Sequence, residues 1–385
     1  MSTRAVFTFL TIAPATLAVA AEPSADPMKE SFDQAWSLVK LYENPDNPVI
    51  QKLAFTGRLQ LDYAIVEGDG APAAGLDEDI SYDFGGWRRL RGGFKATVFE
   101  NFTLHAEADF DPDEAPVYRR LTDAYIGWAP SEAFEVKLGK QGMGFTLDGK
   151  TSSKELLTID RNNLSNNLWF TNEYLPGLTL GGNVGEWSYQ TGVFSQGEED
   201  GEFGNYDAGT TWLASVGYDF GSAMSVDKAL LALDYVYNEE TPAGDLFANR
   251  SLEHVVSLNF VYENGPCGFR GDISAGDGYL GQSDVWGLVA MPYYNFSDKL
   301  QAVFRYTYLD SADADGIRFA RYESDPLGGN RGDAYHEAYL GLNYFLYGHK
   351  LKLQTGLQYV NMNDEPNNGG EFDGFSWTTG LRVSW

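Results

Sequence analysis

The 385-residue chain is predicted to be an all-β protein, a transmembrane antiparallel β-barrel of about 16 strands, and three observations predict this fold. Apolar and polar residues alternate with a period of two through most of the chain after residue 51. Short turns between these segments alternate with long polar connections. Aromatic residues gather at segment ends, and the last segment ends on Trp385. The alternative, a secreted β-sandwich, has no reason to alternate its turn lengths so regularly.

Composition removes several other classes of protein. Aromatic residues make up 15% of the chain, which is far more buryable surface than a disordered protein carries. One cysteine cannot build a disulfide scaffold. A formal net charge of -28 excludes a cationic face for nucleic acid.

The N-terminal part of the chain differs from the rest. Residues 1–21 combine Arg4, an apolar stretch and small residues before Glu22, which predicts a cleaved secretory signal peptide. Residues 22–50 form a linker in which Phe32, Trp36, Val39 and Tyr42 follow a helical spacing, so a short amphipathic periplasmic helix is expected. It either packs on the protein or pairs with copies of itself, or else it is a partly ordered tail. Residues 51–385 are assigned to the barrel.

Sixteen segments carry the two-residue period, in order along the chain. They lie at 52–63, 89–98, 102–110, 122–128, 134–138, 178–184, 186–195, 211–220, 230–237, 254–262, 267–275, 284–294, 300–308, 338–344, 351–359 and 375–385. Long connections are expected at 67–86, 111–117, 142–176, 196–209, 238–251, 310–333 and 361–373. An even number of strands places both ends of the barrel at the periplasmic face, with the long loops outside.

The polar file of these strands contains many cations. Its basic residues are Arg58, Arg89, Arg91, Lys95, Arg119, Lys137, Arg270, Arg305, Lys352 and Arg382. A barrel of this size encloses water, and rings of Arg and Lys on its wall select anions. The alternative is that these cations are only solvated or paired with Glu107, Asp109 and Asp123 on the same wall.

Charge is unevenly distributed along the chain. Residues 52–161 hold 13 Lys and Arg against 19 Asp and Glu, whereas residues 162–385 hold 11 against 30. The acids concentrate in long connections such as 197–202 and 310–315. They either bind divalent cations or keep an outer rim soluble, and the second interpretation is favoured.

Three short stretches carry a resemblance to a known family. They are Gly139-Lys140-Gln141, Thr151-Ser152-Ser153-Lys154 and Ile159-Asp160-Arg161-Asn162, supported by 55–60, 88–91, 123–126 and the aromatic C-terminus. In combination they resemble the phosphate-selective porins of Gram-negative outer membranes. The resemblance covers roughly residues 50–385 and is strongest from 52 to 165.

The resemblance implies a homotrimer of sixteen-stranded barrels in which the third extracellular loop folds inward to form a constriction. By position, Arg58, Arg89, Arg91 and Arg161 resemble arginines of the anion pathway, Lys140 a constriction lysine, and Asp123 the acid that offsets them. Strand phase and loop position add Lys95 and Lys154 to the pathway, with Arg119, Lys137, Arg305 and Lys352 as further basic residues of the lumen.

Two of these positions conflict with strand parity. Parity points Arg88 towards lipid or the barrel rim. Lys140 is out of phase with Lys137, so it reaches the lumen only if the ladder breaks there.

The expected function is an outer-membrane porin for passive diffusion of phosphate, polyphosphate or similar small anions. It involves outer-membrane lipid and no nucleic acid, cofactor, catalytic residue or metal site. One alternative is a general or cation-tolerant porin, and another is a structural barrel or adhesin that uses its acidic loops. A lipid-facing phospholipase needs His254 beside Ser251 or Ser257, and although His254 has the outward phase, Ser257 has the inward one.

Overall fold

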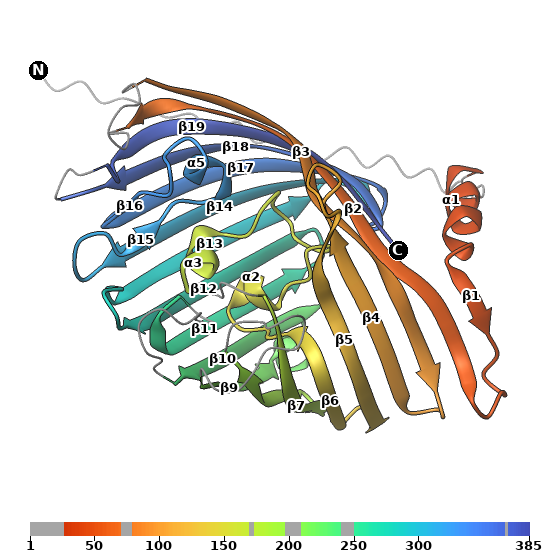
Figure 1. Cartoon of the computed structure of the whole chain (residues 1–385). Coiled ribbons are helices and arrows are strands. Elements are labelled where there is room, and N and C mark those ends of the chain that lie inside the picture. Colours follow the sequence, from red (N-terminus) through yellow and green to blue (C-terminus); the bar gives the residue numbers. More distant parts are fainter. Residues whose placement is uncertain (1–26, 71–78, 169–172, 197–208, 240–249, 366–368) are drawn as a thin grey trace, which may run out of the picture.

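Sixteen strands of the described residues close into an antiparallel β-barrel in the computed structural model (Figure 1). The structure describes residues 27–70, 79–168, 173–196, 209–239, 250–365 and 369–385. The barrel strands are β2 (Ile50–Gly70), β3 (Asp79–Val98), β4 (Phe102–Phe110), β5 (Tyr118–Ser131), β6 (Phe134–Gly142), β7 (Tyr174–Val184), β8 (Trp187–Ser195), β9 (Thr210–Asp219), β10 (Lys228–Asn238), β11 (Leu252–Asn264), β12 (Cys267–Gly278), β13 (Val285–Asn295), β14 (Leu300–Ser311), β17 (Ala334–Tyr347), β18 (Leu351–Asn363) and β19 (Phe372–Ser384). Each predicted segment overlaps one of these strands, so the fold class is confirmed.

The ring closes where the last strand pairs with the first. β19 pairs with β2 from Phe372 opposite Gly70 to Ser384 opposite Arg58. The predicted loop 67–86 is shorter than expected, because β2 continues to Gly70 and β3 begins at Asp79. Ile80, Tyr82 and Phe84 keep the two-residue period through that region and extend the hairpin.

The barrel has an apolar outside and a polar inside. On β10, Leu231, Leu233 and Tyr235 are exposed, whereas Asp234 and Val236 are fully buried. Exposed apolar side chains occur on the outward phase of most strands, as expected for contact with lipid. None of the described helices has the length and apolarity needed to cross a membrane.

The N-terminal segment packs against the barrel. The predicted signal peptide, residues 1–21, lies outside the described residues. The helix is shorter than predicted: α1 (Pro27–Ser37) ends before β1 (Lys40–Glu43), which pairs with β2. The start of β2 extends past the end of β19, so its free edge takes up β1 instead.

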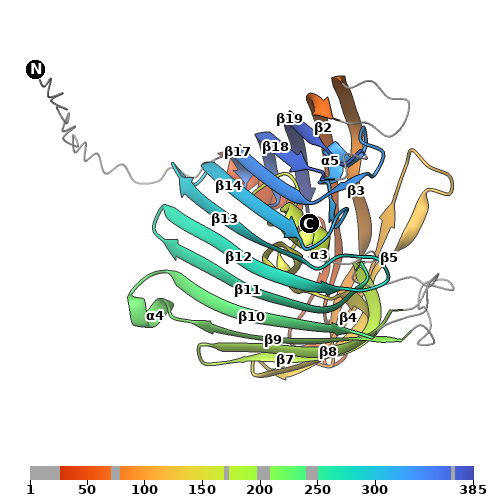
Figure 2. The ribbon, with the colours of Figure 1, turned by 90° about the vertical axis from the view of Figure 1, so that its left-hand side faces the viewer.

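Aromatic contacts hold α1 in place. The rings of Phe32 and Trp36 lie 5.4 and 5.1 Å from the ring of Tyr347. The Trp36 indole donates a 2.7 Å hydrogen bond to the carbonyl of Ser384. The turn ends of the strands lie on the left of Figure 2, together with α4 (Gly221–Met224), and the opposite ends of the strands lie on the right.

Candidate pore lining

Residues 143–168, here called the first inner segment, lie inside the barrel. They connect β6 to β7 and contain α2 (Leu147–Lys150) and α3 (Asn163–Leu168) (Figure 1). Met143, Phe145, Leu164 and Leu168 are fully buried. The apolar side chains of this segment therefore give the polar lumen a small hydrophobic core.

Cations of the wall hold one side of the first inner segment. Arg58 donates to the Ser153 hydroxyl at 2.6 Å. Lys352 donates to the carbonyl of Leu156 at 2.6 Å, and Arg382 to that of Ile159 at 3.1 Å. Arg305 donates to Thr158 and to the carbonyl of Asp160, while its Nε lies 2.6 Å from the carboxylate of Glu337. These four inward cations, here called the clamp cations, bind segment backbone and hydroxyls.

Carboxylates hold the opposite side of the same segment. Asp234 accepts from the backbone N–H of Thr146 at 3.1 Å and lies 2.5 Å from the Lys150 ammonium. Asp272 accepts from the N–H of Leu147 at 2.7 Å. The segment is thus fixed through its carbonyls on one wall and its N–H groups on the other, which satisfies backbone groups that neither helix nor sheet pairs.

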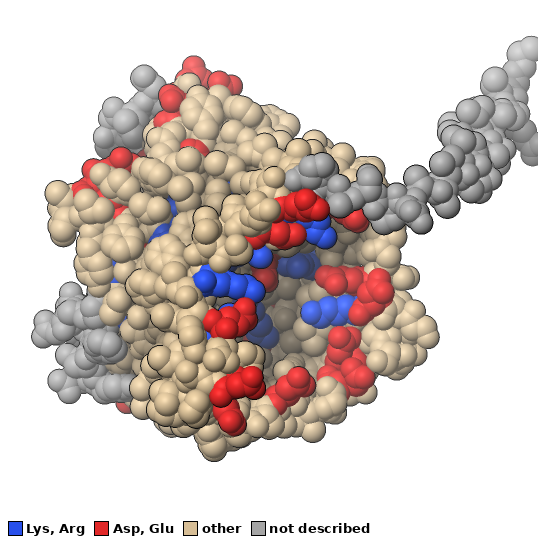
Figure 3. Space-filling model, turned by 90° about the vertical axis from the view of Figure 1, so that its right-hand side faces the viewer, with Lys and Arg blue, Asp and Glu red and all other residues tan. Residues whose placement is uncertain are grey.

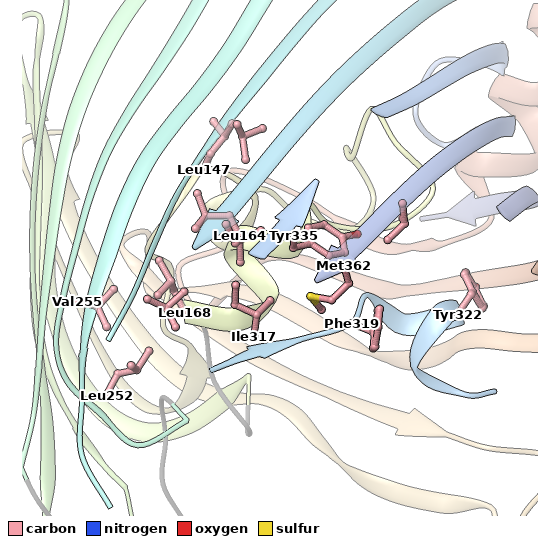
Figure 4. Packing of buried hydrophobic residues seen from close by; sticks show 14 of the residues in the cluster. Leu147, Leu164, Leu168, Leu252, Val255, Ile317, Phe319, Tyr322, Tyr335 and Met362 are labelled. Atoms are coloured by element: carbon pink, nitrogen blue, oxygen red, sulfur yellow. The ribbon is translucent and has the colours of Figure 1, made fainter. Parts of the chain in front are cut away.

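A second stretch of chain also packs inside the barrel, contrary to expectation. Residues 312–333, here called the second inner segment, contain β15 (Ile317–Arg318), α5 (Arg321–Ser324) and β16 (Arg331–Gly332). This stretch was expected to be an exposed polar loop, yet Ile317, Phe319, Tyr322 and Leu327 are buried. Figure 4 shows Ile317 and Phe319 packed between Leu168, Met362 and Tyr335.

Polar contacts tie the two inner segments together. Asn163 and Asn167 donate to the carbonyl of Arg318 at 2.8 and 3.1 Å, and the N–H of Arg318 donates to Asn167 at 2.8 Å. Tyr322 donates to the Asp62 carboxylate on β2. The acids around 310–315 remain near the rim, but the residues after them turn inward because they supply apolar surface to the core.

Two cavities lie on opposite faces of the first inner segment. One, of about 950 Å³, lies at the turn ends of the strands and is lined by Lys150, Thr151 and Glu155 of the segment. The other, of about 960 Å³, lies towards the long connections and is lined by Asp160, Arg161 and Asn166. No described residue lines both. In the space-filling view the molecule is hollowed, and basic and acidic side chains gather in and around the hollow (Figure 3).

The second cavity, here called the arginine cavity, is lined by nine arginines and by seven acids, which are Asp109, Asp111, Asp113, Glu114, Asp160, Glu173 and Asp325. Its basic lining residues are Arg88, Arg89, Arg91, Arg119, Arg120, Arg161, Arg250, Arg318 and Arg321. Several carry carboxylate partners: Arg88 lies 3.0 Å from Asp160, and Arg91 lies 3.4 Å from Asp109. Glu173 lies 3.8 Å from Arg91 and 3.9 Å from Arg161.

The field of these arginines is visible in the titration of the loop acids. Burial alone would raise the pKa of Glu173, but Arg161, Arg89 and Arg91 lower it to about 2. Burial likewise opposes ionisation of Asp160, yet Arg88 and Arg89 bring its pKa well below the ordinary range. Both carboxylates therefore remain charged at any physiological pH and offset part of the positive charge.

Arg89 has a different environment from its neighbours. It is 5% exposed, lines the arginine cavity, and donates to the Gln60 side chain at 2.9 Å. Among the described residues it has no carboxylate within ion-pair distance. It shares the cavity lining with Arg88, Arg161 and Glu173.

Arg88 points inward, so the parity-based expectation for it is wrong. The register of β2 and β3 shifts between Gln60, which faces Arg89, and Leu61, which faces Trp87. Arg88 is the extra residue of this β-bulge, and a bulge re-aims the side chain it carries. This side chain reaches Asp160 on the first inner segment.

The other predicted pathway residues lie in several surroundings. Asp123 faces Glu107 across the β4–β5 ladder, but it is Glu107 that pairs with Arg58, at 3.1 Å. Lys140 is fully buried and follows Gly139, whose φ of 128° interrupts regular strand geometry just before it. Lys95 is exposed.

The remaining predicted cations bind nearby groups. Lys154 donates to the carbonyl of Trp385 at 2.9 Å, and its pKa is lowered to about 8 by burial and by Arg58. Lys137 pairs with Glu135 at 2.9 Å and lines the turn-side cavity. Arg119 pairs with Asp111 at 3.3 Å with more than half of its side chain exposed.

Several residues of the arginine cavity were not predicted. Arg120, Arg250, Arg318 and Arg321 belong to connections or strand ends where no period assigns a direction. One signal was available: Ile317, Phe319, Tyr322 and Leu327 are too apolar for a solvated loop. That pattern predicts burial of the second inner segment and would have brought Arg318 and Arg321 inside with it.

Few described residues could hold a metal, and none forms the serine–histidine pair of a hydrolase. Glu253, His254 and Asp277 form one group with closely spaced ligand atoms, and Asp315, Asp333 and Asp364 form another. In the second group Asp333 and Asp364 accept backbone N–H groups, which is a structural role. Ser257 donates to Asp272 inside the barrel, whereas His254 contacts Tyr235 on the outside.

Comparison with solved structures places the fold among porins. The anion-selective porin of Comamonas acidovorans superimposes with a TM-score of 0.61 at 14% identity, covering 86% of this chain and 99% of that one. OmpF of Salmonella typhi, in complex with daunomycin, gives 0.58 at 13% identity, covering 90% and 100%. The outer-membrane channel DcaP of Acinetobacter baumannii gives 0.54 at 14% identity, covering 87% and 97%.

Sequence comparison gives the family. No curated protein sequence matches the chain significantly. The family described as phosphate-selective porin O and P matches residues 53–253, slightly more than half of the chain, including β2 to β10 and the first inner segment. With a closed sixteen-stranded barrel and this match, the chain is a β-barrel porin of the Gram-negative outer membrane and belongs to the family of phosphate-selective porins O and P.

Proposed function

We propose that this porin passes small hydrophilic solutes by passive diffusion with a preference for anions, and that phosphate-like oxyanions bind beside Arg89 and Arg161 in the arginine cavity. The observation that carries the proposal is Arg89: a buried guanidinium on the cavity wall, surrounded by arginines, that donates to an amide rather than to a carboxylate. An oxyanion replaces the lost hydration of such a group with charge-assisted hydrogen bonds. A guanidinium fork suits phosphate, sulfate and carboxylates alike.

The proposed path runs past the first inner segment. Arg91 and Arg161 share Glu173, and both line the arginine cavity, so both lie beside the proposed path. Lys154 lies on the first inner segment, and Arg58 lies on the barrel wall that holds this segment. Lys95 continues the row of basic residues along β3. The segment thus narrows the pore and supplies the residues that distinguish solutes.

A general or cation-tolerant porin is the alternative that a specific observation favours. Glu107, Asp109, Asp160 and Glu173 each pair with an arginine of this wall. If these pairs cancel the field of the wall, the pore has little selectivity. The two proposals differ in whether Arg89, which has no carboxylate within ion-pair distance among the described residues, leaves the pore with a net positive potential.

Orientation and assembly complete the proposal. The signal peptide 1–21 is removed, residues 22–50 lie in the periplasm, and residues 51–385 form the membrane barrel with its long connections outside. The position of α1 at the turn ends of the strands, beside Ser384, supports this orientation. A homotrimer in outer-membrane lipid is proposed from family membership and from the trimer form described for OmpT of Vibrio cholerae, which is 13% identical.

Planar-bilayer recording tests the proposal. In a KCl gradient the reversal potential should favour chloride, and added phosphate should block the chloride current. Arg89→Gln should weaken this block about tenfold or more, the loss of one charge-assisted contact. Lys350→Gln, at an exposed turn outside the arginine cavity, is the matched control. In this variant phosphate should block the chloride current as it does in the wild type. A reversal potential favouring cations rejects the anion preference, and the absence of channels rejects the porin in favour of a structural barrel or adhesin.

A further inference from the structure

Three arginines lie close together at the long-connection end of the barrel, two of them on the second inner segment. Arg250 immediately precedes β11, while Arg318 and Arg331 belong to β15 and β16. Arg318 and Arg331 are direct partners in the two-residue β15–β16 ladder. Like charges placed opposite each other across strands repel, so this ladder needs compensation.

The described residues provide little negative charge to compensate these arginines. Arg250 donates to the backbone carbonyl of Asn166 at 3.0 Å, and Arg331 to the side-chain oxygen of Gln282 at 3.1 Å. Both acceptors are neutral. The guanidinium of Arg318 has no acceptor and no carboxylate within ion-pair distance among the described residues. Asp315 is the acid that acts on Arg331, from beyond ion-pair distance.

The titration of these groups shows the same excess of positive charge. Burial lowers the pKa of Arg318 to about 9, with Arg250 and Arg331 adding to the effect. Burial and then Arg331 also lower the pKa of Arg250. In the arginine cavity the buried Arg88 and Arg91 have carboxylate partners, whereas no member of this trio has a carboxylate within ion-pair distance among the described residues.

We propose that Arg250, Arg318 and Arg331 together bind one oxyanion that carries about two negative charges, of the inorganic phosphate type, and that this anion fastens the second inner segment to the first. Arg250 and Arg318 line the arginine cavity, so the ligand comes from solution inside the barrel. Both are already joined to α3, Arg250 through Asn166 and Arg318 through Asn163 and Asn167. An anion between their guanidinium groups therefore links β15, β16, α3 and the start of β11.

The inference deepens the proposed function but does not depend on Arg89. Among the described residues Arg89 forms no hydrogen bond or ion pair with Arg250, Arg318 or Arg331, and the proposed anion acts on the packing of the second inner segment rather than on selectivity. A ligand that binds only the packed form slows opening of the segment, by about tenfold when it is present at ten times its Kd.

Hydrogen–deuterium exchange of the full chain tests this inference. The protein is held in a detergent without phosphate groups, and exchange across residues 312–333 is compared in sodium phosphate and in sodium chloride of equal ionic strength. Phosphate should slow exchange in the wild type and in Arg89→Gln, and should have no effect in Arg318→Gln or Arg331→Gln. Lys350→Gln is the control for loss of a cation elsewhere, and chloride conductance verifies that each variant is folded.

The outcomes separate the two proposals. Absence of phosphate protection in the wild type overturns the inference, as does protection that persists in both Arg318→Gln and Arg331→Gln. If the protection is lost in Arg89→Gln as well, phosphate acts through the Arg89 region, and this result also overturns the inference. If Arg318→Gln fails to fold, Arg331→Gln gives the decision, since Arg331 lies directly opposite Arg318 in the β15–β16 ladder. If phosphate slows exchange across residues 312–333 as expected but does not block the chloride current, only the proposed selectivity is rejected.

Discussion

The clamp cations and the arginines of β3 that line the arginine cavity share the inward phase of their strands, but they have different partners. Arg58, Arg305, Lys352 and Arg382 hold the first inner segment through its backbone and hydroxyl groups. Arg89, Arg91 and Arg161 face the arginine cavity instead. The difference shows that an inward cation in a barrel has two separate roles, as a support for the constriction or as part of the path. Which role it takes depends on whether folded chain or water lies opposite.

The largest effect is expected from breaking a clamp that includes a buried ion pair. Arg305→Met leaves Glu337 buried and uncompensated, so the free energy of unfolding should fall by about 3–5 kcal/mol. Equilibrium urea unfolding in lipid vesicles measures the change, with Lys350→Met as the matched surface control. A loss below about 1 kcal/mol, the range of exposed pairs, would mean that Arg305 is not a clamp.

A smaller effect is expected from a clamp without an ion pair. Lys352→Met removes the donor to the carbonyl of Leu156, which the amide of Gln354 also contacts at 3.2 Å. Stability should fall by about 1–3 kcal/mol, and single-channel conductance should become larger and noisier as the first inner segment loosens. Arg89→Gln should change selectivity without this noise. Equal noise in both variants would erase the distinction between clamps and cavity arginines.

The smallest effect should come from Lys154, which ties the first inner segment to the carbonyl of Trp385 and is also a predicted pathway residue. With a pKa of about 8 it is protonated at pH 7 and mostly neutral at pH 9, where only about a tenth of the side chain stays charged. The ratio of chloride to potassium permeability should therefore fall between pH 7 and 9. Lys154→Arg should keep the ratio constant across this range, and a wild-type ratio that does not change with pH assigns Lys154 to support alone.

The strands were predictable from the sequence because a two-residue period survives through most of them. On β10, for example, Leu231, Leu233 and Tyr235 mark the lipid face by themselves. The period also identifies Arg58, Arg89, Arg305 and Lys352 as inward. It cannot tell which of them meets a folded segment, because that depends on contacts more than a hundred residues apart, as between Lys352 and Leu156.

The errors have local causes. Arg88 was misplaced because a single bulge inverts parity, and a bulge leaves no mark in alternation. The second inner segment was taken for a rim loop because the acids at 310–315 dominate its composition, while the apolar residues that bury it begin at Ile317. Its arginines were missed with it.

The added strand β1 has a consequence for how the ring is assembled. β1 occupies the part of β2 that β19 does not reach, and Trp36 contacts Ser384, so the N-terminal helix binds the end of the last strand. This contact joins α1 to the last strand beside the seam between β2 and β19, so it requires the two strands to lie together at that point. Because the chain has nine tryptophans, a variant that keeps Trp36 as its single tryptophan would let indole fluorescence report closure of the barrel.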